Sequence, residues 1–297
     1  MITPANHQSI VVGIDGTAGA LGAARWAAEL AAHQRVPLVL LSVVPALDYR
    51  LTAGAWTESE LLPQLRTAAE RKIEEAAAAM RHGQPELDIR RFVVYGIPAR
   101  KLIEISASAK LIVMGSTASR LGTLLLGSTV LSVANNAECP VAVWRHDGDH
   151  PWPDRRPLLV GVDGSPDSES AIGHAFELAA ALGVGIIAVH AWTEPDLLEW
   201  TVVPDSWPML AAQERELLAE RLAGWGEKFP EVEVTRVVQK GATAEVLLEH
   251  AADAQLVLTG SHGHNRLVGM LAGSTSQNLL HHAPCPVVIC RAPERRG

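Results

Sequence analysis

Residues 10–44 read IVVGIDGTAGALGAARWAAELAAHQRVPLVLLSVV, and residues 158–192 read LLVGVDGSPDSESAIGHAFELAAALGVGIIAVHAW. The two stretches align without a gap. Two further pairs of segments repeat at nearly the same spacing: LIVMGSTAS from Leu111 matches LVLTGSHGH from Leu256, and LLLGSTVLSVANNAECPVAVWR from Leu124 matches MLAGSTSQNLLHHAPCPVVICR from Met270. Repeats that lie this far apart indicate a duplicated domain rather than a solenoid.

Each copy alternates short apolar runs with stretches of helical periodicity. The runs at 9–15, 36–44, 89–96, 110–116 and 139–145 predict strands, as do their counterparts at 157–163, 184–192, 234–241, 255–261 and 285–291. Helices are expected over 20–32 and 58–81, over 168–182 and 209–228, and from Pro98 and Thr243 onward. Such alternation favours a parallel sheet covered by helices on both faces. We therefore predict two Rossmann-like α/β domains, residues 1–146 and 158–297, joined by a Pro- and Gly-containing linker, residues 147–157.

The composition indicates a globular protein and argues against several classes of partner. The chain has 297 residues, 48% of them hydrophobic, and a formal net charge of −8 with Lys and Arg scattered along it. Nucleic-acid binding needs a basic stripe, which the sequence lacks. Neither a signal peptide nor an apolar run of transmembrane length is visible, so the sequence predicts a cytoplasmic protein that does not bind membranes.

The predicted loops after the first and fourth strands carry the residues suited to ligand binding. In an open parallel sheet, ligands bind beyond the carboxyl ends of the strands, where the strand order reverses. Asp15 and Asp163 end the first strands, where a carboxylate can accept hydrogen bonds from ribose hydroxyls; a turn or helix cap is the simpler interpretation. In the second copy, Gly260 and Gly263 follow the fourth strand, and Gly273-Ser274-Thr275 opens a helix whose N-terminus can bind an anion. No Walker A loop and no dinucleotide fingerprint occurs.

The spacing Gly260-x2-Gly263-x9-Gly273-Ser274 resembles the ATP-binding signature of the universal stress protein family, and almost the whole chain resembles the tandem type found in actinobacteria. The resemblance implies a five-stranded sheet of order 3-2-1-4-5, with ATP, together with Mg²⁺, bound between strands 1 and 4. It places the adenine and ribose beside Asp163 and the backbone at Ala191. It also places the ribose and phosphates beside Gly260, Gly263, Gly273, Ser274 and Thr275.

The first copy departs from this signature. Asp15, Val43, Gly115, Gly127, Ser128 and Thr129 keep the corresponding positions, but Ala118 replaces the second glycine, and only eight residues separate it from Gly127. If that position needs a positive φ angle, alanine costs on the order of 1 kcal/mol. On this basis we expect the second copy to bind ATP more tightly than the first.

Other reactive residues have ordinary interpretations. His262, His264, His281 and His282 have no counterparts in the first copy and are expected to face solvent or phosphate rather than a metal. Cys139, Cys285 and Cys290 form no CxxC motif and are expected to be small buried hydrophobes. Trp192, Trp200 and Trp207 are expected to anchor a loop. In the family the fifth strand pairs across a two-fold interface, so VAVW and VVIC could pair within the chain or form a homodimer through edge strands.

The residues suggest a regulator rather than an efficient enzyme, since no catalytic constellation is evident. We predict an ATP-binding regulator or switch in stress response or growth control, with an unidentified protein partner and at most weak ATPase activity. One alternative is a slow ATP-hydrolysing or nucleotidyl-transferring enzyme of the related adenine nucleotide hydrolase-like fold. Its usual Ser-Gly-Gly loop is replaced here by Asp-Gly-Thr and Asp-Gly-Ser. A second alternative is a nucleotide-free scaffold.

Overall fold

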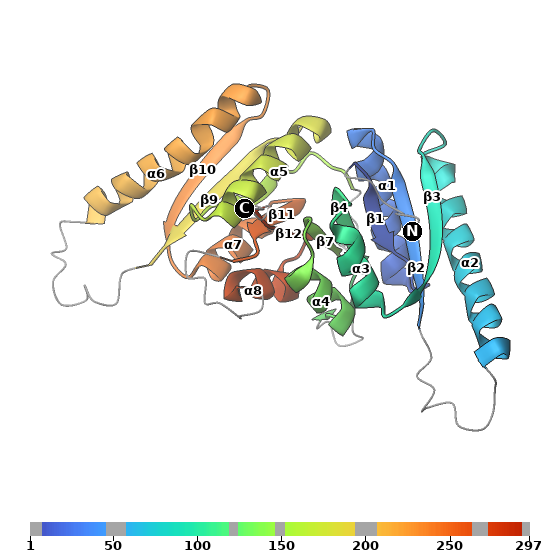
Figure 1. Ribbon diagram of the computed structural model, residues 1–297. Coiled ribbons are helices and arrows are strands. Elements are labelled where there is room, and N and C mark those ends of the chain that lie inside the picture. The colour runs from blue at the N-terminus through green and yellow to red at the C-terminus, as the bar shows by residue number, and fades with distance from the viewer. Residues whose placement is uncertain are drawn as a thin grey trace, which may run out of the picture. The chain divides into compact units, whose positions relative to one another are not determined.

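The computed structural model describes residues 8–45, 58–118, 124–145, 152–193, 207–262 and 273–292. It divides into two compact units, Met1–His146 and Asp147–Gly297 (Figure 1). We call them unit 1 and unit 2.

Unit 1 contains a five-stranded parallel sheet of order β3-β2-β1-β4-β7. Along the chain its elements are β1 (Ile10–Gly13), α1 (Ala18–Gln34), β2 (Leu38–Pro45), α2 (Glu58–Gly83), β3 (Ile89–Gly96), α3 (Pro98–Ser106), β4 (Leu111–Gly115), α4 (Ser128–Asn136) and β7 (Val141–Trp144). A short antiparallel pair, β5 (Thr117–Ala118) and β6 (Leu124–Leu125), lies between β4 and α4 in the sequence. This pair was not predicted from the sequence.

Unit 2 repeats the same topology with the sheet order β10-β9-β8-β11-β12. Its elements are β8 (Leu158–Gly161), α5 (Pro166–Leu182), β9 (Ile186–Trp192), α6 (Trp207–Lys228), β10 (Val234–Lys240), α7 (Thr243–Ala251), β11 (Leu256–Gly260), α8 (Ser274–His282) and β12 (Val287–Cys290). Numbered within each unit, both sheets have the order 3-2-1-4-5. The prediction of two Rossmann-like domains is therefore confirmed.

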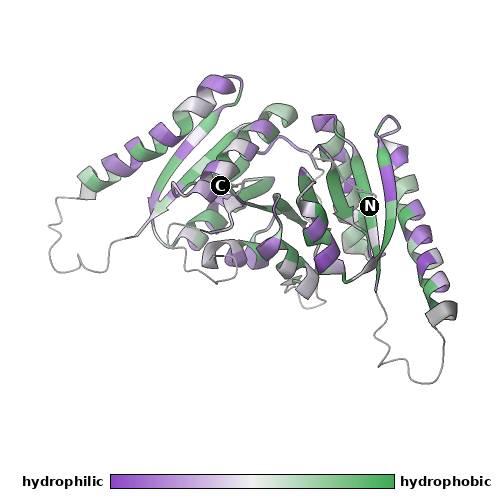
Figure 2. Cartoon of the chain, viewed as in Figure 1, coloured by the Kyte–Doolittle hydropathy of each residue, from purple (hydrophilic) through white to green (hydrophobic). Residues whose placement is uncertain are grey.

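The central strands are buried on both faces, as their continuous apolar sequences predict. In unit 1, Ile10, Val11 and Val12 of β1 have no exposed surface. Helices α1 and α2 contact one another and pack on the sheet, while α3 and α4 contact one another and pack on β2, β4 and β7. Figure 2 shows green strands inside the units and purple residues along the length of α2.

A side-chain cap defines the start of α1 immediately after the first strand. Thr17 is the N-cap of α1, and its Oγ1 accepts a hydrogen bond from the amide of Ala20 at 3.2 Å. Ser165 caps α5 in the same way, accepting from the amide of Ser168 at 3.2 Å. Such caps satisfy backbone donors at a helix start, so the turn that follows β1 or β8 has a defined geometry. Among the helices of the described ranges, none is long and apolar enough to cross a membrane.

Candidate functional site

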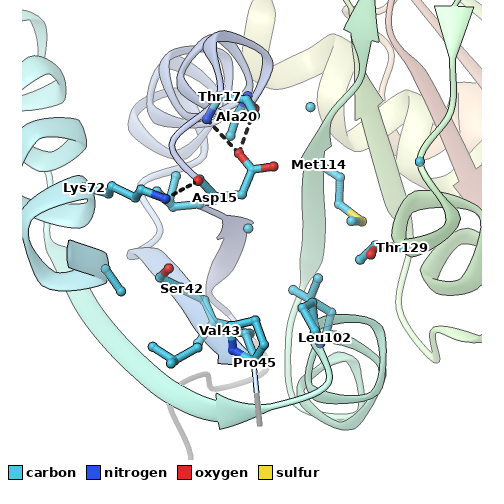
Figure 3. A pocket seen from close by; sticks show the side chains of 18 of the residues that line it. Asp15, Thr17, Ala20, Ser42, Val43, Pro45, Lys72, Leu102, Met114 and Thr129 are labelled. Carbon is cyan, nitrogen blue, oxygen red and sulfur yellow. Dashed lines mark hydrogen bonds between the residues drawn. The ribbon is translucent and has the colours of Figure 1, made fainter. Parts of the chain in front are cut away.

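A cavity of about 450 Å³ lies at the carboxyl ends of β1, β2 and β4 in unit 1 (Figure 3). Strand β1 sits between β2 and β4, so this is the point at which the strand order reverses and where ligands bind in open parallel sheets. The residues that line it are Gly13, Ile14, Asp15, Thr17, Ala20, Leu41, Ser42, Val43, Val44, Pro45, Leu65, Ala68, Ala69, Lys72, Pro98, Leu102, Met114, Gly115, Gly127, Thr129 and Val130.

Asp15 belongs both to the turn after β1 and to the cavity wall. Its Oδ1 atom accepts hydrogen bonds from the amide of Thr17 at 2.8 Å and from Thr17 Oγ1 at 2.7 Å. This is the turn interpretation considered from the sequence. The other carboxylate oxygen, Oδ2, has no hydrogen bond to any residue that the structure describes. One oxygen of Asp15 therefore holds the turn while the second can accept a hydrogen bond from a ligand.

Lys72 is a lining residue that the sequence analysis missed. It projects from α2, and its Nζ donates to the backbone oxygen of Asp15 at 2.8 Å (Figure 3). Its stem lies against Gly16, where φ is +89° and where a Cβ atom would lie 2.7 Å from Lys72 Cε. The only signal in the sequence is the position of Lys72 beside the apolar stripe that contains Ala69 and Ile73. The cavity therefore contains a cation as well as a carboxylate.

The end of β2 forms the floor between Asp15 and α2. Ser42 is 4% exposed and lines the cavity together with Val43, whose position had been predicted. The opposite wall comes from Met114 (Figure 3) and from Gly115, both at the end of β4. Most of this surface is apolar, which suits the flat ring of a base, and backbone groups at the strand ends can supply hydrogen bonds.

The start of α4 completes the wall. Gly127 is the N-cap of α4, and no side chain of a residue that the structure describes caps the first amides of this helix. Gly127 and Thr129 line the cavity, whereas Ser128 is exposed and is not one of the lining residues. A helix N-terminus with uncapped amides and a threonine hydroxyl offers donors to an anion. Of the residues predicted in unit 1, Asp15, Val43, Gly115, Gly127 and Thr129 thus surround one cavity.

In unit 2, the two halves of the glycine signature meet at the end of β11. The amide of Gly273 donates to the backbone oxygen of Ser261, directly after Gly260, at 2.8 Å. Ser276 Oγ donates to the backbone oxygens of both Gly273 and Ser261. Ser274 and Thr275 begin α8 beside this junction. Gly263 and His264 lie outside the described residues.

Asp163 occupies the same kind of turn as Asp15. Its Oδ1 accepts from the amide of Ser165 at 2.9 Å. Ala191 lies near the end of β9, in the position that Val43 holds in β2. The predicted unit 2 residues that are described therefore lie at the carboxyl ends of β8, β9 and β11 and at the start of α8.

A buried carboxylate in unit 2 was also missed. Asp167, in the first turn of α5, is 5% exposed and stands where unit 1 has Gly19. It accepts hydrogen bonds from Ser261 Oγ at 2.6 Å, from the amide of His262 at 3.2 Å and from the amide of Ala292 at 2.9 Å. Ser261 is 1% exposed, and its hydroxyl lies both against Asp167 and 2.9 Å from His262 Nδ1.

A second polar pair in unit 2 joins β9 to α6. His190 is 8% exposed; its Nδ1 lies 2.7 Å from the backbone oxygen of Val162, and its Nε2 lies 2.8 Å from Glu214 Oε2. His190 therefore joins the backbone that follows β8 to helix α6 through its two ring nitrogens. The sequence offered no sign of this pair, because His190 lies in a strand that is otherwise apolar.

The remaining candidates have the surroundings of ordinary residues. His281 and His282 are exposed, and no cluster of three potential metal ligands occurs among the described residues. Cys139, Cys285 and Cys290 are buried free thiols. Burial raises the pKa of Cys139 to about 12 and also raises the pKa of Cys290. Trp200 and the side chain of Trp207 lie outside the described residues, whereas Trp192 ends β9.

Comparison with known proteins agrees with this architecture. The model of the universal stress protein family matches residues 6–145 and again residues 154–291. A universal stress protein of Mycobacterium tuberculosis is 40% identical over 98% of this chain and 99% of its own length. A universal stress protein of Mycolicibacterium smegmatis is 38% identical over 98% of this chain and 99% of its own length. The crystal structure of a universal stress protein from Archaeoglobus fulgidus covers 96% of this chain and 99% of its own, with a TM-score of 0.73 at 18% identity.

Two α/β units of this topology, each with a carboxylate after the first strand, define a tandem protein of the Rossmann-like class. The chain belongs to the universal stress protein family, with two of the family's domains.

Proposed function

We propose that the chain binds ATP at the carboxyl ends of the sheet strands and acts as a nucleotide-dependent regulator. The observation that carries the proposal is the cavity of unit 1, in which a carboxylate oxygen, a lysine and an uncapped helix N-terminus converge on an apolar floor. Its volume of about 450 Å³ lies within the range of small-molecule sites.

Each part of the cavity matches one part of the nucleotide. The base would lie on the apolar surface formed by the end of β2, where Val43 offers backbone groups. A ribose hydroxyl would donate to Asp15 Oδ2. The phosphates would accept hydrogen bonds from the first amides of α4 and from Thr129. Mg²⁺ would arrive with the triphosphate, which supplies the oxygen ligands that this ion prefers.

The same assignment extends to unit 2, where Asp163 would bind ribose and Gly273, Ser274 and Thr275 would bind phosphate. A regulator also needs a partner that reads the bound state. We propose that this partner is a second protein that contacts the surface around the occupied site. The homodimer through edge strands stays a prediction.

The first test is to denature the purified protein and to identify released nucleotide by chromatography. We expect ATP in an amount comparable to that of the chain. Release of ADP or AMP after loading with ATP would instead favour the slow hydrolase. A cyclic nucleotide would change the ligand while leaving the site in place. No release, together with no binding of added Mg-ATP, would contradict the proposal and leave a scaffold.

A further inference from the structure

Three positions that line the cavity in unit 1 carry different side chains in unit 2. Ser42 lies four residues after Leu38, which pairs with Ile10, and His190 lies four residues after Ile186, which pairs with Leu158 in the same register. His190 is therefore the counterpart of Ser42.

The helices α2 and α6 can be matched in the same way. Ile73 of α2 and Leu218 of α6 are both buried, 2% and 1% exposed, and lie at the same distance before the last helical residue. By this alignment Glu214 replaces Ala69, and Leu217 replaces Lys72.

These exchanges alter the end of the site where we place the base. In unit 1, Ser42 and Ala69 are small and leave the floor of the cavity open. In unit 2, the two corresponding side chains are large and are hydrogen-bonded to each other at 2.8 Å. A base that entered there would have to displace the hydrogen-bonded side chains of His190 and Glu214, which are 10% and 29% exposed, and would leave polar groups without their partners.

The exchanges also remove a cation from the site. Unit 1 holds Lys72 beside Asp15, so the cation offsets the carboxylate. Unit 2 has Leu217 in place of this lysine, and its buried Asp167 is hydrogen-bonded to Ser261 and His262 of the signature loop. Because ATP is a polyanion, a lysine at the site strengthens its binding, and replacement of that lysine by leucine weakens it.

We infer that the unit 1 cavity is the tighter ATP site, that Lys72 is a specificity-determining contact in it, and that the His190–Glu214 pair lowers the affinity of unit 2. The inference rests on the proposed function. It reverses the order that the glycine signature alone predicts, because that signature describes only the phosphate end of the site.

The test exchanges the pair between the units of the full-length protein and titrates each variant with Mg-ATP by calorimetry. Ser42→His with Ala69→Glu should weaken the tighter binding transition about tenfold or more. His190→Ser with Glu214→Ala should leave the tighter transition unchanged and strengthen the weaker one. Removing both partners of a buried pair is less costly than removing one, and thermal unfolding checks that each variant is folded.

A charge variant tests Lys72 separately. Lys72→Met should weaken the tighter transition about tenfold and reduce its dependence on salt. Arg71→Met is the matched control, since Arg71 precedes Lys72 on α2 and its side chain is 73% exposed. The inference is overturned if the unit 1 exchange spares the tighter transition or if the unit 2 exchange abolishes it. Absence of any binding to the wild-type chain would instead contradict the proposed function itself.

Discussion

At the scale of single residues, Asp15 combines a structural and a ligand-binding role in one carboxylate. Asp15→Asn separates the two, because the amide oxygen can still accept from the Thr17 amide while the amino group replaces the acceptor that faces the ligand. We expect near-normal stability and ATP affinity weakened about tenfold or more, since hydrogen bonds to charged groups contribute about 1.5–3 kcal/mol. Calorimetric titration beside urea unfolding measures both quantities.

Asp88→Asn is the matched control for this substitution. Asp88 precedes β3, its side chain is 55% exposed, and its partner is Arg90, so it removes the same charge away from the cavity. If Asp15→Asn binds ATP as the wild type does, the second oxygen of Asp15 is not a ligand contact.

Burial of Cys139 predicts a loss of stability in alkali. Its pKa is raised from 9.0 to about 12, so the unfolded chain releases the thiol proton over a pH range in which the folded chain keeps it. The free energy of unfolding should therefore be unaffected by this group below pH 9 and should fall between about pH 9 and 12, by at most about 1.4 kcal/mol per pH unit. Urea unfolding across this range should show a shallower decline for Cys139→Ala; an identical slope would count against the effect.

At the scale of the elements, α1 and α5 end with the same backbone conformation but with different residues. Arg35 follows α1 with φ at +54°, and Gly183 follows α5 with φ at +67°. The left-handed conformation costs a residue with a side chain about 1 kcal/mol, and Arg35 is exposed. We expect Arg35→Gly to raise the free energy of unfolding by up to about 1 kcal/mol. Gly183→Ala should lower the free energy of unfolding by a similar amount. A less stable Arg35→Gly or a more stable Gly183→Ala in urea unfolding would refute the argument.

The start of α1 approaches the end of β4 so closely that no side chain fits between them. A Cβ atom on Gly115 would lie 2.2 Å from the backbone oxygen of Gly19, whereas one on Gly127 would have no neighbour within 4 Å. Gly115→Ala should therefore cost about 1–3 kcal/mol of stability, as overpacking does, while Gly127→Ala meets no neighbour and should lose only the preference for glycine over alanine at an N-cap. Thermal unfolding of the two variants makes the comparison. Equal stability would mean that the backbone shifts freely at this contact.

At the scale of the whole molecule, the fold could be predicted because the signal for it is local and present twice. Strands buried on both faces carry unbroken apolar runs, and helices such as α2 carry their periodicity over many turns. Asp15, Asp163 and the start of α4 could be placed because each follows or opens one of these elements.

The contacts that distinguish the two sites were not predictable in this way. Lys72 and Asp15 are 57 residues apart, with β2 between them in the sequence. Asp167 and Ser261 are 94 residues apart. His190 and Glu214 meet only after β9 and α6 have packed. Each pairing depends on which way a side chain points from a distant helix or strand, and the periodicity of a single element holds no information about that.

The hydrogen bond from Gly273 to Ser261 has a consequence for how such chains diverge. This bond joins the two ends of the segment that connects β11 to α8. In unit 1 the β5–β6 pair, Thr117 with Leu125 and Ala118 with Leu124, joins the ends of the corresponding segment between β4 and α4. Because its ends are hydrogen-bonded, each connecting segment can gain or lose a residue without shifting the register of the sheet. Insertions and deletions can therefore accumulate between these joined ends, and this position in the sequence is suited to grafting a reporter peptide.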